Sequence, residues 1–166
     1  MTSLDQIDVR PAGPGNEGQA AQLLYTTARP VFEFIYGADR DFMFAMLAWQ
    51  WQAQESLFSH SHALGAYDRA GNLVGLELGF DHAGEAAAFA GSHAVAQARA
   101  TAAQRAHISQ AAGQLTYLTP VTPAGNYCVH NLAVDPDAGI AGLGRHLLQG
   151  AFQRAAAGGY RAVCLD

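Results

Sequence analysis

The amino-acid sequence predicts a single α/β domain, and three observations carry that prediction. Two apolar runs at residues 63–67 and 73–80 flank the turn residues Asp68–Asn72, which predicts a β-hairpin. Near the end of the chain, a strand pattern at 127–134, a glycine-rich turn, a helical pattern and a strand pattern at 161–165 form a βαβ-like unit. The length of 166 residues, half of them hydrophobic, fits one core.

The remaining elements follow from local patterns. Apolar spacing predicts helices, and Pro30 separates the first from the second. The stretch from 83 to 112 is dominated by alanine, which favours a helix that packs closely on a neighbour. In chain order we expect a strand at 7–10, helices at about 14–28, 31–36 and 39–55, the hairpin, the alanine-rich helical stretch, and a proline-containing loop at 116–124.

Composition excludes several functions. Nine arginines, no lysine and fourteen acidic residues give a net charge of −5, which is too acidic for a general nucleic-acid binder. The absence of lysine excludes Schiff-base chemistry and the lysine-bearing phosphate loop of nucleotide hydrolases. No apolar run approaches the roughly 18 residues of a membrane span and no signal-peptide pattern is present, so we expect a cytoplasmic protein that does not bind membranes.

No metal site is predicted. Cys128 and Cys164 lie in apolar runs without a CxxC partner, and are expected to be buried, reduced side chains. His60 and His62 lack a third ligand. Ten of the fourteen acidic residues fall in residues 1–83, which weakly favours a cationic ligand at that end.

Three glycines follow the strand at 127–134 and open the next helix. Gly139, Gly142 and Gly144 let the backbone approach a ligand, and the first N–H groups of a helix bind phosphates. Their spacing is G-x-x-G-x-G, whereas the dinucleotide-binding pattern is G-x-G-x-x-G. This spacing disfavours a nicotinamide oxidoreductase.

Leu132–Pro136, followed by Gly142–Arg145 and by Leu147-Leu148, resembles motif A of the GCN5-related N-acetyltransferases. The resemblance implies a mixed, mostly antiparallel central sheet flanked by helices, in one domain over residues 1–166 that is short at its C-terminal end. Its parts would be an acceptor side at about 1–82, an alanine-rich helical insert at about 83–113 and an acetyl-CoA-binding part at about 126–166.

By the same resemblance, the backbone of Leu132, Ala133 and Val134 would hydrogen-bond the pantetheine arm of acetyl-CoA. The N–H groups of the loop would hold its pyrophosphate, and the Arg145 side chain would add a contact to phosphate. The loop departs from the family pattern at its first two positions, which hold glycine and isoleucine. The loop residues concerned are Gly139, Ile140, Ala141, Gly142, Leu143, Gly144 and Arg145.

The transfer requires a neutral amine, so a general base is expected near the thioester. His130 is the first candidate because histidine titrates near neutral pH, and a base histidine matches this position in arylalkylamine-type members. It precedes Leu132 by two, which predicts that both lie on one strand face. Glu77 is the second candidate base, and Asn131 is expected on the opposite face. Phe32 and Tyr36 are candidates for the acceptor pocket.

We therefore expect an N-acetyltransferase that moves the acetyl group of acetyl-CoA to a primary amine by direct attack in a ternary complex, without a metal or covalent intermediate. The acceptor is a small molecule or a protein. The helix and strands that usually follow the strand at 161–165 have no counterpart, which leaves an open edge and predicts a homodimer. The alternative is a non-catalytic module that binds acyl-CoA or mediates an interaction.

Overall fold

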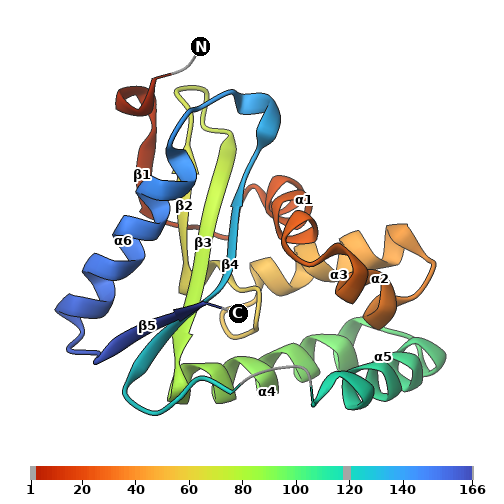
Figure 1. Cartoon of the computed structure of the whole chain (residues 1–166). Helices are drawn as coiled ribbons and strands as arrows, with labels where there is room; N and C mark the ends of the chain where they lie inside the picture. Colours follow the sequence, from red (N-terminus) through yellow and green to blue (C-terminus); the bar gives the residue numbers. More distant parts are fainter. Residues whose placement is uncertain (1–2, 118–120, 166) are drawn as a thin grey trace.

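The computed structural model describes residues 3–117 and 121–165. Its centre is a five-stranded sheet whose strands follow one another in sequence order (Figure 1). The first four strands pair antiparallel and the last pair is parallel, so the predicted mixed, mostly antiparallel sheet is confirmed. The strands are β1 (Asp8–Pro11), β2 (Ala63–Tyr67), β3 (Leu73–Asp81), β4 (Asn126–Val134) and β5 (Ala162–Leu165).

Helices cover both faces of the sheet. The helix α6 packs on one face, while α1 and α3 lie against the other (Figure 1). The helix α4 starts where β3 finishes and packs on α3 (Figure 1). The helix α2 packs on α5 and α3. The helices are α1 (Glu17–Thr27), α2 (Arg29–Tyr36), α3 (Arg40–Gln52), α4 (His82–Arg99), α5 (Ala102–Leu115) and α6 (Leu143–Ala157). Within the described ranges, none is long and apolar enough to cross a membrane.

Side-chain caps decide where several helices begin. The Asp39 carboxylate accepts a hydrogen bond from the Phe42 N–H at the start of α3. The alanine-rich stretch forms two helices rather than one, because Thr101 and Gln104 make a capping box that begins α5. Pro30 lies in the first turn of α2, where its missing N–H removes no helical hydrogen bond, so the predicted break between the first two helices is confirmed.

Two apolar cores lie on the two faces of the sheet. Leu76 and Leu78 of β3 pack with Leu24 and Trp51 on the face covered by α1 and α3. Val74, from the same strand, packs with Leu143 and Leu147 of α6 on the opposite face, together with Ala66 and Ile140. Regular alternation would place Val74 on the same face as Leu76 and Leu78. The register between β2 and β3 shifts at this point, because Ala66 pairs with Gly75 and Tyr67 pairs with Leu73, and this bulge turns Val74 toward α6.

One irregularity in β4 shapes the site. Leu78 pairs with Asn131 and Gly79 pairs with Val129, so His130 is the extra residue at this register shift. Such a β-bulge breaks the alternation of side chains. Val129 packs against Ala151 and Ala155 of α6, and Val134 also faces α6. His130 contacts Phe80, and Asn131 contacts Thr27 of α1, so these two neighbours lie on the other face.

Candidate acetyl-transfer site

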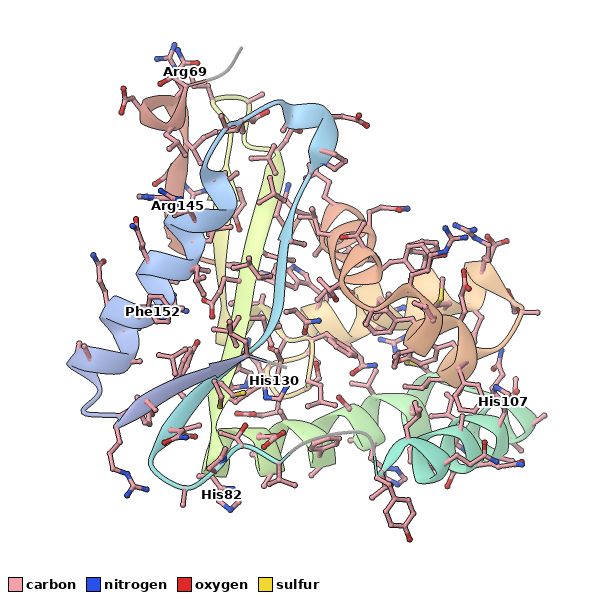
Figure 2. The ribbon with its side chains drawn as sticks, viewed as in Figure 1. Arg69, His82, His107, His130, Arg145 and Phe152 are labelled. Atoms are coloured by element: carbon pink, nitrogen blue, oxygen red, sulfur yellow. The ribbon has the colours of Figure 1, made fainter. Side chains whose placement is uncertain are left out.

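The loop before α6 combines buried anchors with an exposed backbone. Ile140 and Leu143 are buried in the core beneath the loop, whereas Gly139, Gly142 and Arg145 are exposed. Gly142 precedes the first helical residue with φ 83°, a left-handed conformation that favours glycine. No side chain caps this end, so the first N–H groups of α6 are left available to a ligand. Figure 2 shows Arg145 in the first part of α6.

The neighbouring edge of β4 is open over half its length. β4 pairs with β5 from Asn126 to Val129 only, and beyond Val129 no described strand lies on that side. The Gly144 side of α6 faces this open part, because a Cβ there would lie 4.0 Å from Leu132 Cδ2 and 3.8 Å from Val134 Cγ2. An uncapped helix end and an open strand edge thus lie side by side.

A cavity of about 670 Å³ lies on the opposite face of β4. Phe32 and Ile35 of α2 form part of its wall, as do Phe80 of β3 and residues from α4 and α5. His130 and Asn131 line it from the bulge. The sequence-predicted base and one of the two predicted pocket aromatics therefore meet in a single cavity, and Figure 2 shows His130 at the tip of β5.

Polar groups surround His130 at the cavity wall. Its Nε2 atom lies 3.6 Å from Glu85 Oε1 of α4 and 3.4 Å from Thr122 Oγ1. The Glu85 carboxylate also accepts a hydrogen bond of 2.9 Å from the Thr122 N–H. The side chains of Glu85 and His130 are 4% and 13% exposed. A carboxylate beside a histidine stabilises the imidazolium that forms when the ring takes a proton.

The bulge corrects two expectations about β4. His130 and Leu132 lie on opposite faces, because the extra residue shifts the alternation that placed them together. Asn131 was expected away from His130, yet it lines the same cavity, and its Nδ2 donates to Thr27 Oγ1 over 2.8 Å. A bulge leaves little trace in a sequence, since an extra strand residue looks like any other.

Glu77 lies elsewhere. It is fully buried on β3, forms an ion pair with Arg154 of α6 and accepts a hydrogen bond of 3.2 Å from the Tyr127 hydroxyl. Arg154 also donates to the Tyr127 hydroxyl over 3.0 Å. Burial lowers the pKa of the Arg154 guanidinium. The structure therefore places the Glu77 carboxylate on the α6 face and does not bring it together with His130.

Tyr36 also lies apart from the cavity lining. It is buried among the helices α2 and α3, where Gln50 Nε2 donates to its hydroxyl over 2.8 Å. Burial raises the pKa of this phenol well above its usual range.

Sequence reasoning missed Glu85, although one signal was available. Glu85 is the only acidic residue between positions 82 and 134.

The two histidines near β2 make ordinary contacts. His60 Nδ1 lies 2.7 Å from the Trp51 carbonyl oxygen, and His62 Nε2 lies 3.4 Å from Glu55 Oε2. Over residues 3–117 and 121–165, no three histidine, cysteine, aspartate or glutamate side chains lie close enough together to hold a metal ion. Cys128 and Cys164 are free thiols, as expected, but only Cys128 is buried. Cys164 is half-buried, because it lies on β5 at the edge of the sheet.

No family model matches the chain, and neither does any curated protein sequence. Solved structures do match. One crystal structure described as an acetyltransferase has a TM-score of 0.75 at 18% identity, over 95% of this chain and 79% of that chain. An N-acetyltransferase from Staphylococcus aureus Mu50 has a TM-score of 0.57 at 15% identity, over 89% and 75%.

A third structure, of a protein named SsHAT, has a TM-score of 0.55 at 18% identity, over 96% of this chain and 82% of that chain. These matches extend over nearly the whole chain. The chain has the fold of the GCN5-related N-acetyltransferases.

Proposed function

We propose that the protein transfers the acetyl group of acetyl-CoA to a primary amine by direct attack in a ternary complex. The observation that carries this proposal is the open edge of β4 beside the uncapped N-terminus of α6. A strand edge binds an extended, amide-bearing chain through its backbone, and a helix N-terminus binds phosphate. In acetyl-CoA, the pantetheine arm is an extended, amide-bearing chain that fits the strand edge, and the pyrophosphate fits the helix N-terminus.

The geometry supports one direction for the bound acetyl-CoA. In the proposed complex, the pyrophosphate lies on the N–H groups of residues 139–145 with Arg145 beside it, and the pantetheine arm runs along Leu132, Ala133 and Val134. His130 is the first residue of β4 beyond its pairing with β5. Four residues of strand span about 13 Å, a distance of the order that an extended pantetheine arm covers. The thioester then lies at the His130 end, next to the cavity.

In this arrangement the cavity holds the acceptor. His130 Nε2 takes a proton from the ammonium group, and Glu85 stabilises the imidazolium. The amine nitrogen attacks the thioester carbonyl, the N–C bond forms, and the C–S bond breaks to release the CoA thiolate. The amide nitrogen loses its second proton and the thiolate gains one, so the products are the N-acetyl amine and CoA.

Calorimetric titration of acetyl-CoA tests the cofactor site with two matched glycine variants. Gly144→Glu adds a negative charge beside the proposed phosphate position, at an ordinary backbone conformation where a Cβ has van der Waals room. Gly18→Glu adds the same charge on α1, where nothing lies within 4 Å of a Cβ. Binding that is lost in Gly144→Glu and retained in Gly18→Glu supports the proposal. A folded native chain that binds no acetyl-CoA contradicts it.

Turnover separates the enzyme from the alternative acyl-CoA-binding module. The native chain is mixed with acetyl-CoA and a panel of primary amines, and the release of the CoA thiol is measured. Tight binding of acetyl-CoA without thiol release above the hydrolysis rate favours the binding module. A cytoplasmic homodimer is part of the proposal, and sedimentation of the native chain gives its mass in solution.

A further inference from the structure

We infer that the acceptor is a monoamine with a large apolar body and no carboxylate, and that Glu85 is the group that receives its ammonium. This inference rests on the proposed acetyl transfer and names the substrate class for the same site. It follows from the chemistry of the cavity on the α1 face of β4.

The cavity wall is mostly apolar. Four phenylalanines from four different segments line it, and Ile35 of α2 lies among them. A volume of about 670 Å³ falls within the range of ordinary small-molecule sites. Such a wall favours an aromatic or branched alkyl body, because each apolar group that it covers is removed from water. The phenylalanines are Phe32, Phe58, Phe80 and Phe89.

Charge in the cavity is confined to one place. Glu85 is the only acidic residue among the described lining residues, and it is 3% exposed. The described lining contains no arginine, and the sequence contains no lysine. The other titratable groups that line the cavity are His82, whose Nδ1 lies 2.8 Å from the Thr122 carbonyl oxygen, and His130. A buried carboxylate without a permanent cation favours a positively charged ligand.

The charges of the described lining residues also disfavour α-amino acids and polyamines as acceptors. An α-amino acid carries a carboxylate next to its amine, which would lie against Glu85 in a cavity without arginine or lysine. A polyamine carries further ammonium groups, which would lie against phenylalanine walls without a second acid. A single ammonium on an apolar body leaves no charge unpaired.

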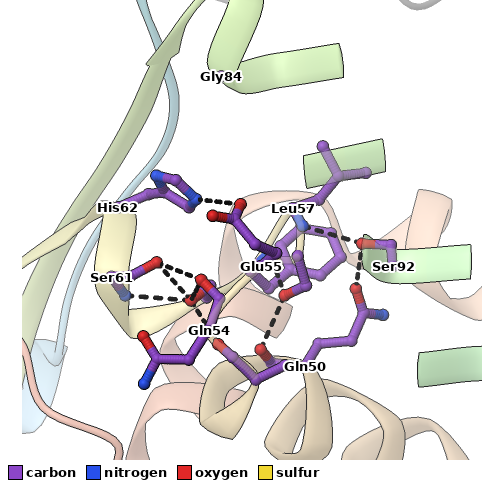
Figure 3. Close-up of polar contacts among 12 residues, drawn as sticks. Gln50, Gln54, Glu55, Leu57, Ser61, His62, Gly84 and Ser92 are labelled. Atoms are coloured by element: carbon purple, nitrogen blue, oxygen red, sulfur yellow. Dashed lines mark hydrogen bonds and ion pairs between the residues drawn. The ribbon is translucent and has the colours of Figure 1, made fainter. Parts of the chain in front are cut away.

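The wall that carries Glu85 is held firmly. The Glu55 backbone passes so close to α4 that a Cβ at Gly91 would lie 2.1 Å from the Glu55 carbonyl oxygen. The Leu57 N–H donates to Ser92 Oγ over 2.9 Å, and Ser92 Oγ donates to Gln50 Oε1 over 2.6 Å (Figure 3). These contacts position α4, which carries Glu85, against α3 and the segment that follows it, which carries Phe58.

Acceptor preference is measured with phenethylamine, L-phenylalanine and spermidine, each with saturating acetyl-CoA. L-Phenylalanine is phenethylamine with a carboxylate added, so the pair isolates the effect of that charge. We expect kcat/KM for phenethylamine to exceed that for either other amine by about a hundredfold. Glu85→Gln is expected to raise KM for phenethylamine about tenfold and to leave the acetyl-CoA Kd unchanged. The matched control is Glu55→Gln, since the Glu55 side chain is 60% exposed.

A second variant does not depend on a buried position. Phe89 is 48% exposed at the cavity, so Phe89→Glu adds an acid without emptying the core. This variant is expected to shift the ratio of kcat/KM values toward spermidine by about tenfold, relative to phenethylamine.

The inference is overturned if L-phenylalanine or spermidine reacts as well as phenethylamine, or if Glu85→Gln behaves as Glu55→Gln does. It is also overturned if acetyl-CoA binds but phenethylamine neither binds in calorimetry nor releases thiol. Failure of acetyl-CoA itself to bind is a different result, which contradicts the proposed function.

Discussion

The Glu85 carboxylate lies 3.6 Å from the Nε2 atom of His130, and the two residues come from different parts of the fold. Glu85 belongs to the first turn of α4, and His130 is the bulged residue of β4. Both side chains are nearly buried at one cavity wall, so the carboxylate lies next to the ring nitrogen with little water around either group.

The first prediction concerns this pair. His130→Ala is expected to lower kcat at neutral pH by about a hundredfold or more, because it removes the proposed general base. The acetyl-CoA Kd is expected to remain within about twofold, since the imidazole lies on the face away from Leu132. Steady-state kinetics and calorimetry check the two values. His93→Ala is the control, because His93 is exposed on α4. Equal losses of turnover and cofactor binding would show that His130 is structural.

The second prediction concerns the buried ion pair under α6. Arg154→Met leaves the fully buried Glu77 carboxylate without its cation, and is expected to reduce the free energy of unfolding by about 3 kcal/mol. This lies at the low end for buried pairs, because the Arg154 side chain is 34% exposed. Urea unfolding measures the loss. The double variant Glu77→Leu with Arg154→Met is expected to recover most of it, since no charge then remains buried. A double variant no more stable than Arg154→Met contradicts this account.

The third prediction concerns alkaline pH. Burial raises the pKa of both Tyr36 and Tyr127 from an ordinary value of 10.0. Below about pH 10 both phenols are protonated whether the chain is folded or not, and their contribution to stability is complete. As the pH rises further, the unfolded chain loses these protons while the folded chain keeps them, so stability falls.

Urea midpoints at pH 9 and pH 11 measure this decline. The chain has no lysine, so the tyrosines are the principal groups that titrate above pH 10. Tyr127→Phe is expected to make the decline between the two pH values smaller. Tyr117→Phe is expected to leave it unchanged, because Tyr117 is 96% exposed. If the stability of both variants falls equally between pH 9 and pH 11, the raised pKa of Tyr127 does not cause the decline.

The fourth prediction concerns the contact between α4 and the segment after α3. Gly91→Ala places a Cβ 2.1 Å from the Glu55 carbonyl oxygen, so the backbone must shift. The expected loss of stability is about 1 to 3 kcal/mol, and KM for phenethylamine is expected to rise because the Glu85 wall moves. Gly18→Ala is the control on α1, where nothing lies within 4 Å and the change favours the helix by about 0.5–1 kcal/mol. Thermal unfolding distinguishes the two, and equal stability would contradict the close contact.

Much of the fold was predictable, because local patterns decide it. The hairpin at β2 and β3 followed from turn residues, and the start of α6 followed from Gly142 and its neighbours. The cavity was harder. Phe32 was expected there and lines it, but Tyr36 has the same aromatic character and lies in the core instead. Periodicity places a residue on a helix face, whereas the packing of α2 on α3 and α5 decides which face meets the cavity.

The position of Glu85 shows a second reason why the cavity could not be predicted fully from the sequence. The alanine-rich stretch has few large side chains, so its pattern gives little information about its partner in the fold. The acid in that stretch is Glu85. It reaches His130 of β4 only because α4 starts at the end of β3, which is the neighbour of β4 in the sheet (Figure 1). Contacts between segments so distant in sequence are set by topology rather than by local propensity.

The extra residue in β4 changes the phase of the strand. A regular strand presents every second side chain to a given side, so two adjacent residues never share one. With His130 as an extra residue in β4, Val129 and Val134 both pack under α6, while His130 and Asn131 lie next to each other at the cavity. Deleting one residue there would restore regular alternation and still allow β4 to pair with β3, but His130 and Asn131 could no longer both face the cavity. The one extra residue thus lets a single strand contribute apolar side chains to the core under α6 and polar side chains to the cavity.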